Sequence, residues 1–406
     1  MISCKSNNPI RVVIVGAGSR AISLCQILSL NTLSSKAKVV AIADTNTEKS
    51  HILNKYFDLN ADIYDDFEPM VEREDIDAVI ISTPDYCHVA PALAAFKAHK
   101  NMYLEKPLAT THLDCDTMIN AAKHSSAICY LGFNMRHSPV HEKIYELVTE
   151  GSVGKVCTIE ANEYYYGGKT YFRRWNRLRK FGGGLWLTKA CHDFDLITWI
   201  AGGNPSKIYA TCNLSHYKKV EEAGSNCSNC KVKYTCHDYY DINKPLDDEH
   251  TELWRQLQLT MIRDDDTAPD MCLFNSDKDT FDNGIAVIDY DNDIRATYTV
   301  NVLAAKSTRQ MRVIGTAGMI EADTYEASVI FTQRHTNNVI KYNLTKETIG
   351  AHDGADEKIL NDFFDTCRNN SVPRSGLSDG RLAVQISIAA QESSDNNCVI
   401  NLETIS

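Results

Sequence analysis

A glycine-rich turn near the N-terminus carries the first residues with recognisable chemistry. Gly16-Ala17-Gly18-Ser19-Arg20-Ala21 directly follows the apolar run at residues 12–15 and directly precedes a segment with helical spacing. In that context Gly16 permits a tight turn, Gly18 lets the backbone touch a pyrophosphate, and the small Ala21 lets the helix pack close to the strand. The helix N-terminus then offers N–H groups to the anion. The sequence therefore predicts a dinucleotide site here; the alternative is a glycine turn without a ligand.

Asp44 stands at the end of the second apolar run, 26 residues after Gly18. An acidic side chain at that place hydrogen-bonds the ribose hydroxyls and repels a 2′-phosphate, which favours NAD over NADP. Arg20 would soften this preference if it contacted a phosphate. Alternatively, Asp44 caps the helix that follows, since Asp is a good N-cap residue.

Two later stretches hold groups that can move protons or stabilise charge. Leu104-Glu105-Lys106-Pro107 ends a predicted strand, on the carboxyl edge where doubly wound sheets bind ligands. A run of three glycines at residues 182–184 precedes Lys189 and His192 on a predicted helix. Oxidation of a secondary alcohol needs an acceptor for the hydroxyl proton, and histidine is the usual choice. Taken singly, a strand-end lysine is usually a surface charge and a helical histidine is usually structural.

Of these groups, His192 has the chemistry of a proton acceptor, and Lys106 has that of a donor to negative charge on a reacting oxygen. Lys189 lies three residues before His192, and on one continuous helix the two side chains would share a face. Lys189 would then orient the substrate or tune the imidazole; alternatively, it is a helix-surface charge.

An aromatic and basic stretch precedes the three glycines. Tyrosines fill residues 164–166, and Tyr171-Phe172-Arg173-Arg174-Trp175 follows. Aromatic faces stack on sugar C–H surfaces, and arginine binds hydroxyl or carboxylate groups. We expect Tyr166, Arg173 and Trp175 to contact substrate, although a role in the core or in a subunit interface is about equally consistent with these residue types.

Cysteines are dense only at Cys227-Ser228-Asn229-Cys230 and the nearby Cys236. The C-x-x-C spacing lets two thiolates bind one metal, and the later Cys272 is a candidate fourth ligand. A structural Zn²⁺ or an iron–sulfur cluster is therefore one interpretation of Cys227, Cys230, Cys236 and Cys272. Unligated thiols are the alternative.

The elements that must position these groups fall into two patterns. Short apolar runs at residues 11–15, 39–43, 78–82, 101–104 and 128–133 alternate with helical segments, which predicts a parallel, doubly wound sheet. After residue 133 the chain has one helix at 139–150 and longer alternating runs at 156–166, 207–213, 284–290, 294–302, 310–315 and 329–333. These predict a mainly antiparallel sheet, with helices at 191–200, 355–369 and 378–393 on one of its faces.

The fold class is thus α/β, with a Rossmann domain at residues 1–133 and an α+β domain with an open, mainly antiparallel sheet at 134–406. The polar, cysteine-bearing stretch at about 220–270 reads as an insertion into the second domain.

Composition excludes several classes of protein. Lys and Arg number 42 against 53 Asp and Glu, a formal charge of −11, and no basic run suited to nucleic acid occurs. No apolar run reaches the roughly 18 residues that span a bilayer. The polar N-terminus does not read as a secretory signal. The 14 cysteines are scattered through predicted strands and helices, so a reducing cytoplasm is the expected location.

In this order, the motifs resemble those of the Gfo/Idh/MocA family of NAD(P)-dependent oxidoreductases over nearly the whole chain. The resemblance includes Ser82-Thr83-Pro84-Asp85 with His88, Glu105-Lys106-Pro107, Gly132-Phe133-Asn134-Met135-Arg136, the Gly-Gly-Gly then Lys-x-x-His-x-x-Asp stretch, and Ala351-His352-Asp353-Gly354-x-Asp356. It implies a Rossmann domain, an open-sheet domain that often forms dimers or tetramers, and a substrate pocket between the two.

The same resemblance implies roles for individual residues. Lys106 would lie beside the nicotinamide and His192 at the substrate hydroxyl. The expected cofactor-binding residues beyond the glycine turn and Asp44 are Thr83, Pro84, His88, Glu105, Lys106, Asn134 and Arg136, and Asp195 joins the expected substrate residues. One position departs from the pattern: many members carry Asp four residues before the histidine, where Thr188 stands here, so an Asp-His relay is not assumed.

These observations predict an NAD-dependent dehydrogenase acting on a secondary hydroxyl of a sugar, cyclitol or glycoside, as a homo-oligomer without nucleic-acid or membrane partners. One alternative keeps NAD bound and cleaves a glycoside through a transient 3-keto sugar, with no net redox change. Another is a regulator that senses NAD or a sugar without catalysis. Lys106 and His192 favour an enzyme, because a sensor needs no proton acceptor.

Overall fold

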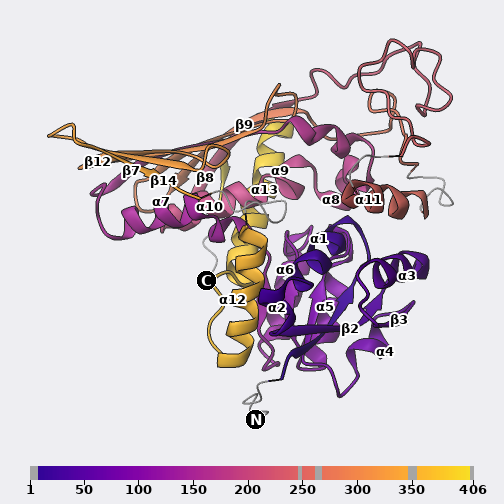
Figure 1. The fold of residues 1–406 in the computed structure, drawn as a ribbon. Helices are drawn as coiled ribbons and strands as arrows, with labels where there is room; N and C mark the ends of the chain where they lie inside the picture. The colour runs from indigo at the N-terminus through magenta and orange to yellow at the C-terminus, as the bar shows by residue number, and fades with distance from the viewer. Residues whose placement is uncertain (1–7, 246–248, 261–267, 346–353, 403–406) are drawn as a thin grey trace. The chain divides into compact units, whose positions relative to one another are not determined.

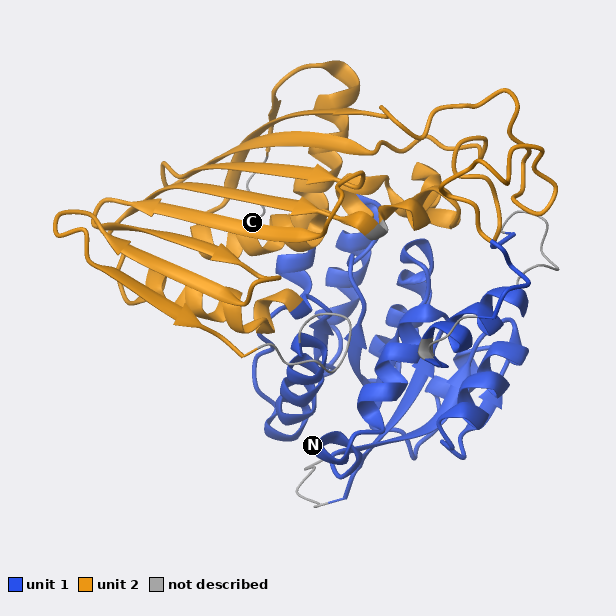
Figure 2. Cartoon of the chain, turned by 45° about the horizontal axis from the view of Figure 1, so that its top comes forward, with its two compact units in different colours: residues 1–134, 241–269, 349–381 blue, residues 135–240, 270–348, 382–406 orange. Residues whose placement is uncertain are grey.

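The computed structural model describes residues 8–245, 249–260, 268–345 and 354–402 of the chain. By internal contacts the chain forms two units: unit 1 contains residues 1–134, 241–269 and 349–381, and unit 2 contains residues 135–240, 270–348 and 382–406. Figure 2 colours them separately. The division differs from the sequence-based boundary because two later segments of the chain return to unit 1.

Unit 1 is built on a six-stranded parallel sheet with the strand order β3-β2-β1-β4-β5-β6. This is the predicted doubly wound arrangement, and the strand order reverses between β1 and β4. The strands are β1 (Ile10–Val15), β2 (Ala37–Ala43), β3 (Asp62–Tyr64), β4 (Ala78–Ile81), β5 (Asn101–Leu104) and β6 (Cys129–Leu131). The central strands β1 and β4 are almost wholly buried, which explains their continuous apolar sequences.

The helices of unit 1 connect these strands or cover them. They are α1 (Ser19–Leu28), α2 (Asn31–Ser34), α3 (Thr47–Tyr56), α4 (Glu68–Val71), the 3₁₀ turn η1 (Asp85–Cys87), α5 (Val89–Lys97), α6 (His112–Ala122), α11 (Glu249–Leu259) and α12 (Ala355–Asn369). Helix α3 begins where the Asn46 side chain accepts the Glu48 N–H, and α6 where Thr111 accepts the Asp114 N–H.

Helix α12 corrects one prediction. It was expected to pack on the second sheet, but Ile359, Leu360, Phe363 and Phe364 lie in the same core as β1 and α1, in unit 1. Helix α11 also joins this core, through Leu253 and Leu257. The segment at 220–270 is therefore not wholly irregular, because α11 forms within it.

Unit 2 contains a nine-stranded sheet with the order β14-β13-β12-β11-β7-β10-β9-β8-β15. Among its described strands every pairing is antiparallel except that of β7 with β10, so the sheet is mixed but mainly antiparallel, as predicted. The strands are β7 (Val156–Tyr164), β8 (Pro205–Asn213), β9 (Asn283–Tyr290), β10 (Arg295–Asn301), β11 (Thr308–Gly315), β12 (Gly318–Asp323), β13 (Ser328–Gln333), β14 (Val339–Asn343) and β15 (Ile400–Asn401).

The described part of unit 2 also contains helical segments, and two of them pack on the sheet. They include α7 (Pro139–Thr149), η3 (Tyr166–Phe172), η4 (Trp175–Arg177), α8 (Arg179–Gly182), α9 (Leu185–Thr188) and α10 (Cys191–Ala201), while η2 (Asn134–His137) and α13 (Leu377–Asn396) straddle the boundary between the units. Figure 1 shows α7 and α10 beneath the sheet, and α10 packs on β7. On the other face, Tyr209, Ile285 and Val287 are exposed.

Candidate active site

The glycine turn of unit 1 has the geometry that a dinucleotide needs. Gly16 has a φ of +94°, and a Cβ there would come within 2.8 Å of the Thr83 nitrogen, so only glycine fits. Nothing lies within 4 Å of the place where a Cβ on Gly18 would stand. Gly18 caps α1 without a side-chain hydrogen bond to the first turn. The backbone therefore packs closely against Thr83 at Gly16, whereas at Gly18, where α1 begins, there is space beside the backbone for an anion.

Asp44 follows β2 directly and faces this turn. Its Oδ2 atom accepts the Ala17 N–H at 2.8 Å, and its Oδ1 atom accepts the Asn46 N–H at 2.8 Å. Because Asn46, and not Asp44, is the N-cap of α3, the capping alternative for Asp44 is not what the structure shows. The carboxylate instead joins the end of β2 to the glycine turn.

Lys106 lies just after the carboxyl end of β5, and Glu105 is the one residue between them. His88 is fully buried, and its two ring nitrogens lie 2.7 Å from the Pro107 carbonyl and 3.1 Å from the Thr83 carbonyl. Burial lowers the pKa of this imidazole. His88 therefore lies between the segments that follow β4 and β5 and contacts the backbone at Pro107, the residue after Lys106.

Arg20 stands at the centre of a buried polar network in unit 1. Its Nε donates to Glu105 at 2.6 Å, and its two terminal nitrogens donate to the Asp356 carboxylate at 2.9 and 2.6 Å. Asp356 also accepts from the Asn134 amide at 2.6 Å, and Glu105 accepts from the Tyr103 hydroxyl at 3.1 Å. These contacts occupy the groups with which Arg20 would bind a phosphate. They favour a positioning role for Arg20 over the cofactor contact expected from the sequence.

Two buried polar atoms in unit 1 fit a bound ligand. Thr83 Oγ1 and Asn134 Oδ1 are buried and have no hydrogen-bond partner in the described part of the chain. Buried polar atoms are nearly always paired, so both atoms have hydrogen-bonding capacity that the described residues leave unused. Thr83 also adjoins Gly16, and Pro84 follows it as the residue before η1. The residues around the glycine turn thus suit a dinucleotide.

In unit 2, Lys189 and His192 do not lie on one continuous helix, which corrects the premise of the sequence argument. Helix α9 ends at Thr188, Lys189 is its C-cap, and α10 begins at Cys191. The chain reaches α9 through Gly183 and Gly184, which have φ angles of +66° and +84°. His192 is buried in the first turn of α10, with 5% of its surface exposed.

Lys189 belongs to a buried cluster of two cations and two carboxylates. Its Nζ lies 3.0 Å from Glu163, while Arg309 Nε lies 2.5 Å from Glu163 and 3.0 Å from Asp193. The Tyr298 hydroxyl donates to Asp193 at 2.8 Å. Burial is the largest single influence and lowers the pKa of Lys189, but Glu163, Tyr171 and Asp193 together outweigh it and the pKa is raised. Lys189 is therefore a permanent ammonium and not a base.

Arg136 and Asp195 bind each other. Arg136 donates to the Asp195 carboxylate at 2.8 and 2.6 Å, and both side chains are buried. The guanidinium also stacks on Trp199, 5.5 Å from the ring centre. The sequence assigned Arg136 to cofactor and Asp195 to substrate, but the bidentate pair gives each of them a structural partner in unit 2.

The aromatic and basic stretch separates into different environments. Tyr166 is 64% exposed, whereas Arg173 donates to the carbonyls of Met271 at 2.9 Å and Asp238 at 3.1 Å. Arg173 therefore anchors the cysteine-bearing segment, which is a structural use that the sequence did not reveal. Trp175 opens η4 and packs near Gly182.

The cysteine segment does not support the metal prediction. Cys227, Cys230 and Cys272 are buried and Cys236 is half-buried. In the described residues, no group of three or more His, Cys, Asp or Glu side chains is arranged to hold a metal ion. Of the late motif, Asp356 is described, but His352 and Asp353 lie outside the described residues.

Glu163 and Arg309, two members of the buried cluster around Lys189, were missed by the sequence analysis although each left a signal. Glu163 and Arg309 occupy inward positions in the alternating patterns of β7 and β11, where apolar side chains are expected. Charged residues at inward positions indicate a buried ion pair.

A parallel sheet with a dinucleotide turn, Asp44 at the end of the next strand and Lys106 at a strand end defines an NAD-binding oxidoreductase. The description "Oxidoreductase family, NAD-binding Rossmann fold" matches residues 10–133, and "Oxidoreductase family, C-terminal alpha/beta domain" matches residues 145–402. The chain belongs to the Gfo/Idh/MocA family of oxidoreductases.

Individual relatives agree with this membership. YteT of Bacillus subtilis, which is named as an oxidoreductase, is 30% identical over 87% of this chain and 88% of its own length. Myo-inositol 2-dehydrogenase of Thermotoga maritima is 24% identical over 84% of each chain. The structure of levoglucosan dehydrogenase with NADH and levoglucosan superposes with a TM-score of 0.75 at 16% identity, covering 98% of this chain and 100% of that one, which shows the shared fold. None of the helices in the described ranges is long and apolar enough to traverse a bilayer.

Proposed function

We propose that this protein is an NAD-dependent dehydrogenase that oxidises a secondary hydroxyl of a sugar, cyclitol or glycoside. The observation that carries the proposal is the placement of Lys106. It is the second residue after β5, and the residue between them, Glu105, accepts a 2.6 Å hydrogen bond from Arg20 next to the dinucleotide turn. Relatives named for myo-inositol and levoglucosan support the substrate class.

Different residues of the chain would bind the cofactor, stabilise charge on the substrate and accept the proton. NAD bound at the glycine turn would supply the hydride acceptor. Gly16, Gly18, Thr83 and Asp44 would hold it, with Asp44 selecting NAD over NADP through the ribose hydroxyls. The Lys106 ammonium would donate a hydrogen bond to the substrate oxygen and stabilise its developing negative charge. His192 would accept the hydroxyl proton.

Lys189 would contribute a fixed positive charge. Since Glu163 keeps it protonated, its role is to donate hydrogen bonds to the substrate or to favour the neutral form of a nearby imidazole. Tyr165 supports this position, because its ring centre lies 4.3 Å from the Lys189 nitrogen.

The test is NADH formation by the purified protein across a panel of inositols, hexoses, methyl glycosides and levoglucosan. We expect turnover with at least one of them, a loss of roughly 10²-fold or more in kcat for Lys106→Ala and for His192→Ala, and NAD affinity unchanged in both variants. Glycoside cleavage without NADH accumulation would instead support the redox-neutral alternative. Sugar binding with no chemistry on any panel member would support the sensor.

We also propose that the protein is a cytoplasmic homo-oligomer that associates through the open face of its unit 2 sheet. Tyr209 and Val287 are paired neighbours on β8 and β9, and with Ile285 they expose apolar surface on that face. Light scattering should report a dimer or tetramer, and Val287→Asp should shift it towards a monomer. A monomeric wild-type protein would contradict this proposal.

A further inference from the structure

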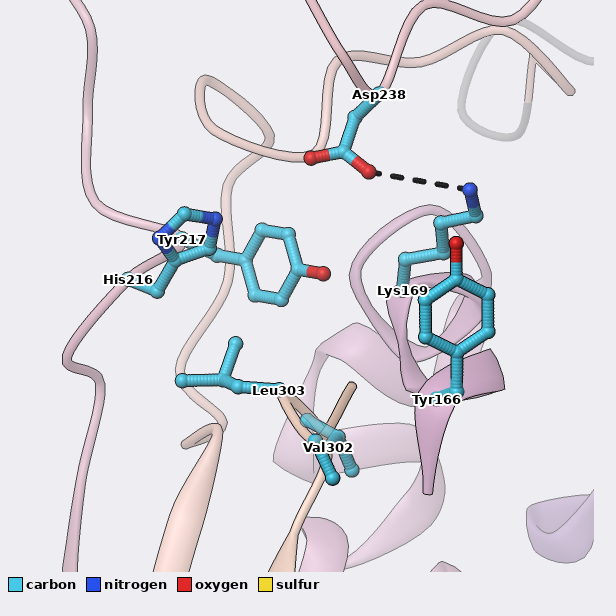
Figure 3. A pocket seen from close by; sticks show the side chains of 8 residues that line it. Tyr166, Lys169, His216, Tyr217, Asp238, Val302 and Leu303 are labelled. Atoms are coloured by element: carbon cyan, nitrogen blue, oxygen red, sulfur yellow. Dashed lines mark ion pairs between the residues drawn. The ribbon is translucent and has the colours of Figure 1, made fainter. Parts of the chain in front are cut away.

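Unit 2 contains a cavity of about 240 Å³ beside the aromatic stretch. Four stretches line it: η3, the residues that follow β8, Asp238 of the cysteine-bearing segment, and the residues after β10. Figure 3 shows the lining side chains, which are Tyr166, Lys169, His216, Tyr217, Asp238, Val302, Leu303 and Ala304. The volume lies below the roughly 300–1,000 Å³ of pockets for drug-sized ligands and suits a single small ring.

Tyr217 gives this cavity a fixed hydrogen-bonding group. Tyr217 is only 6% exposed. Its ring packs on the ring of Phe172, with the centroids 4.4 Å apart, and on that of Phe274 at 5.6 Å. Its backbone is fixed as well, because the buried Asp282 carboxylate accepts the N–H groups of Ser215, His216 and Tyr217.

The Tyr217 hydroxyl itself makes no hydrogen bond to any residue that the structure describes, and it points into the cavity (Figure 3). Burial and the nearby Asp238 charge raise its pKa to about 12, so the phenol stays protonated and can donate. The ring is held in place, so its hydroxyl offers a fixed donor to a group that enters the cavity.

Two opposite charges lie near this hydroxyl. Lys169 and Asp238 are 3.8 Å apart, too far for a direct hydrogen bond, so the ammonium keeps donors and the carboxylate keeps acceptors for a third group. Figure 3 shows both side chains beside Tyr217. Tyr166 adds an exposed ring, and Val302 and Leu303 supply an apolar surface.

These groups together select a class of ligand. A pyranose ring carries hydroxyls that both donate and accept, and its C–H face packs on aromatic rings. Lys169 and Asp238 cancel in charge, so the cavity does not favour a phosphate, which needs a surplus of positive charge. A neutral sugar ring matches the donor, the acceptor, the aromatic ring and the volume.

One stretch of chain contributes both to the cavity and to the surroundings of Lys189. Tyr165, whose ring faces Lys189, directly precedes Tyr166, and Phe172 lies between Tyr171 and the arginines of the same stretch. Resting on the proposed function, we propose that this cavity is a subsite for a second pyranose ring, so that the substrate is a disaccharide or larger glycoside and not a lone sugar or cyclitol.

The experiment measures how a second ring changes recognition. Methyl pyranosides of glucose, galactose, mannose and xylose are compared with their disaccharides, by ligand-observed NMR binding and by NADH formation. We expect at least one disaccharide to bind about tenfold or more tightly than its single ring, a factor that corresponds to about 1.4 kcal/mol. Tyr217→Phe and Lys169→Met should each bring that ratio close to one, with kcat on the single ring unchanged.

Tyr234→Phe is the matched control, because Tyr234 also lies between β8 and β9 but is 90% exposed. It should keep the ratio of the wild-type protein. The subsite proposal is overturned if no disaccharide gains over its single ring, or if the gain survives both cavity variants. Failure of the proposed function looks different: the disaccharide gain in the binding measurement remains, but NADH forms with none of the sugars.

Discussion

Arg20 and Asp356, which are 336 residues apart in the sequence, form a bidentate pair in unit 1 at 2.9 and 2.6 Å. Arg20 belongs to the dinucleotide turn, and Asp356 opens α12. Since Arg20 also binds Glu105, the residue before Lys106, the pair holds three segments in one arrangement. Asp356 therefore acts on the candidate lysine through Arg20 and Glu105, as a positioning residue.

Asp356→Asn should lower kcat by about tenfold while leaving the Kd for NAD within about twofold, because the amide keeps the shape but loses the charge that fixes Arg20. The unfolding free energy should also fall, by up to about 3–5 kcal/mol, the usual result of removing one partner from a buried pair. Glu357→Gln is the control, since Glu357 is the next residue and makes an exposed contact to Thr32. A stability loss with unchanged kcat would mean that Asp356 is only structural.

Glu163 and Lys189 support a prediction about the alkaline side of the activity profile. Glu163 is the largest factor that raises the pKa of Lys189, so wild-type Lys189 stays charged throughout the usual assay range. In Glu163→Gln that factor is gone while burial still lowers the pKa, so an alkaline loss of activity should appear at lower pH than in the wild-type protein. Kinetics of kcat against pH checks this.

Glu160→Gln is the matched control for that profile. Glu160 lies on the same strand, but it is half exposed and pairs with Arg312 at 2.9 Å. Its variant should keep the wild-type pH profile. If Glu163→Gln and Glu160→Gln behave alike, Lys189 does not take part in turnover.

Asp44 sets the third prediction, which concerns the choice of cofactor. Asp44→Ser removes the negative charge that would repel a 2′-phosphate, and Lys49 lies 3.8 Å from that carboxylate. The ratio of kcat/KM for NAD to that for NADP should fall by at least about tenfold, the effect of 1.4 kcal/mol. Asp65→Ser, at an exposed position, should leave the ratio unchanged. An unaltered ratio in Asp44→Ser would remove Asp44 from cofactor selection.

Much of the fold follows from local pattern. Runs such as residues 78–82 and 101–104 were predicted as strands because strands buried on both faces must be apolar throughout. Strand β3 was missed because it has only three residues at the sheet edge, and β14 because its side chains are mostly exposed and leave no alternation. Helix α12 was predicted with its correct bounds, but its apolar stripe does not specify which sheet it covers.

The candidate site was predictable only where its chemistry is local. The glycine turn and Lys106 are set by a strand end and the residues next to it, so sequence spacing is sufficient. Partnerships such as Arg20 with Asp356 depend on long-range packing, which no local pattern encodes. The prediction that Lys189 and His192 share one helical face was wrong for a local reason. The helix ends at Lys189, and the sequence there has no proline or glycine that would indicate the break.

His141 predicts how stability changes with pH. It is buried in α7, and burial together with the Arg309 charge lowers its pKa from 6.5 to about 3. Between pH 6.5 and about pH 3, this histidine is therefore protonated in the unfolded chain but neutral in the folded protein. The free energy of unfolding consequently decreases as the pH falls below about 6.5. Between about pH 7 and pH 4.5 this one group should cost the folded state roughly 2–3 kcal/mol.

His141→Gln does not titrate, so its unfolding free energy relative to that of the wild-type protein should improve by roughly 2–3 kcal/mol over the same change in pH. Urea unfolding at several pH values measures this difference and separates it from any constant cost of the substitution. His124→Gln, at an exposed position, should follow the wild-type curve. Parallel curves for His141→Gln and the wild-type protein would show that His141 is protonated in the folded state, because only a histidine that titrates alike in both states leaves no pH dependence.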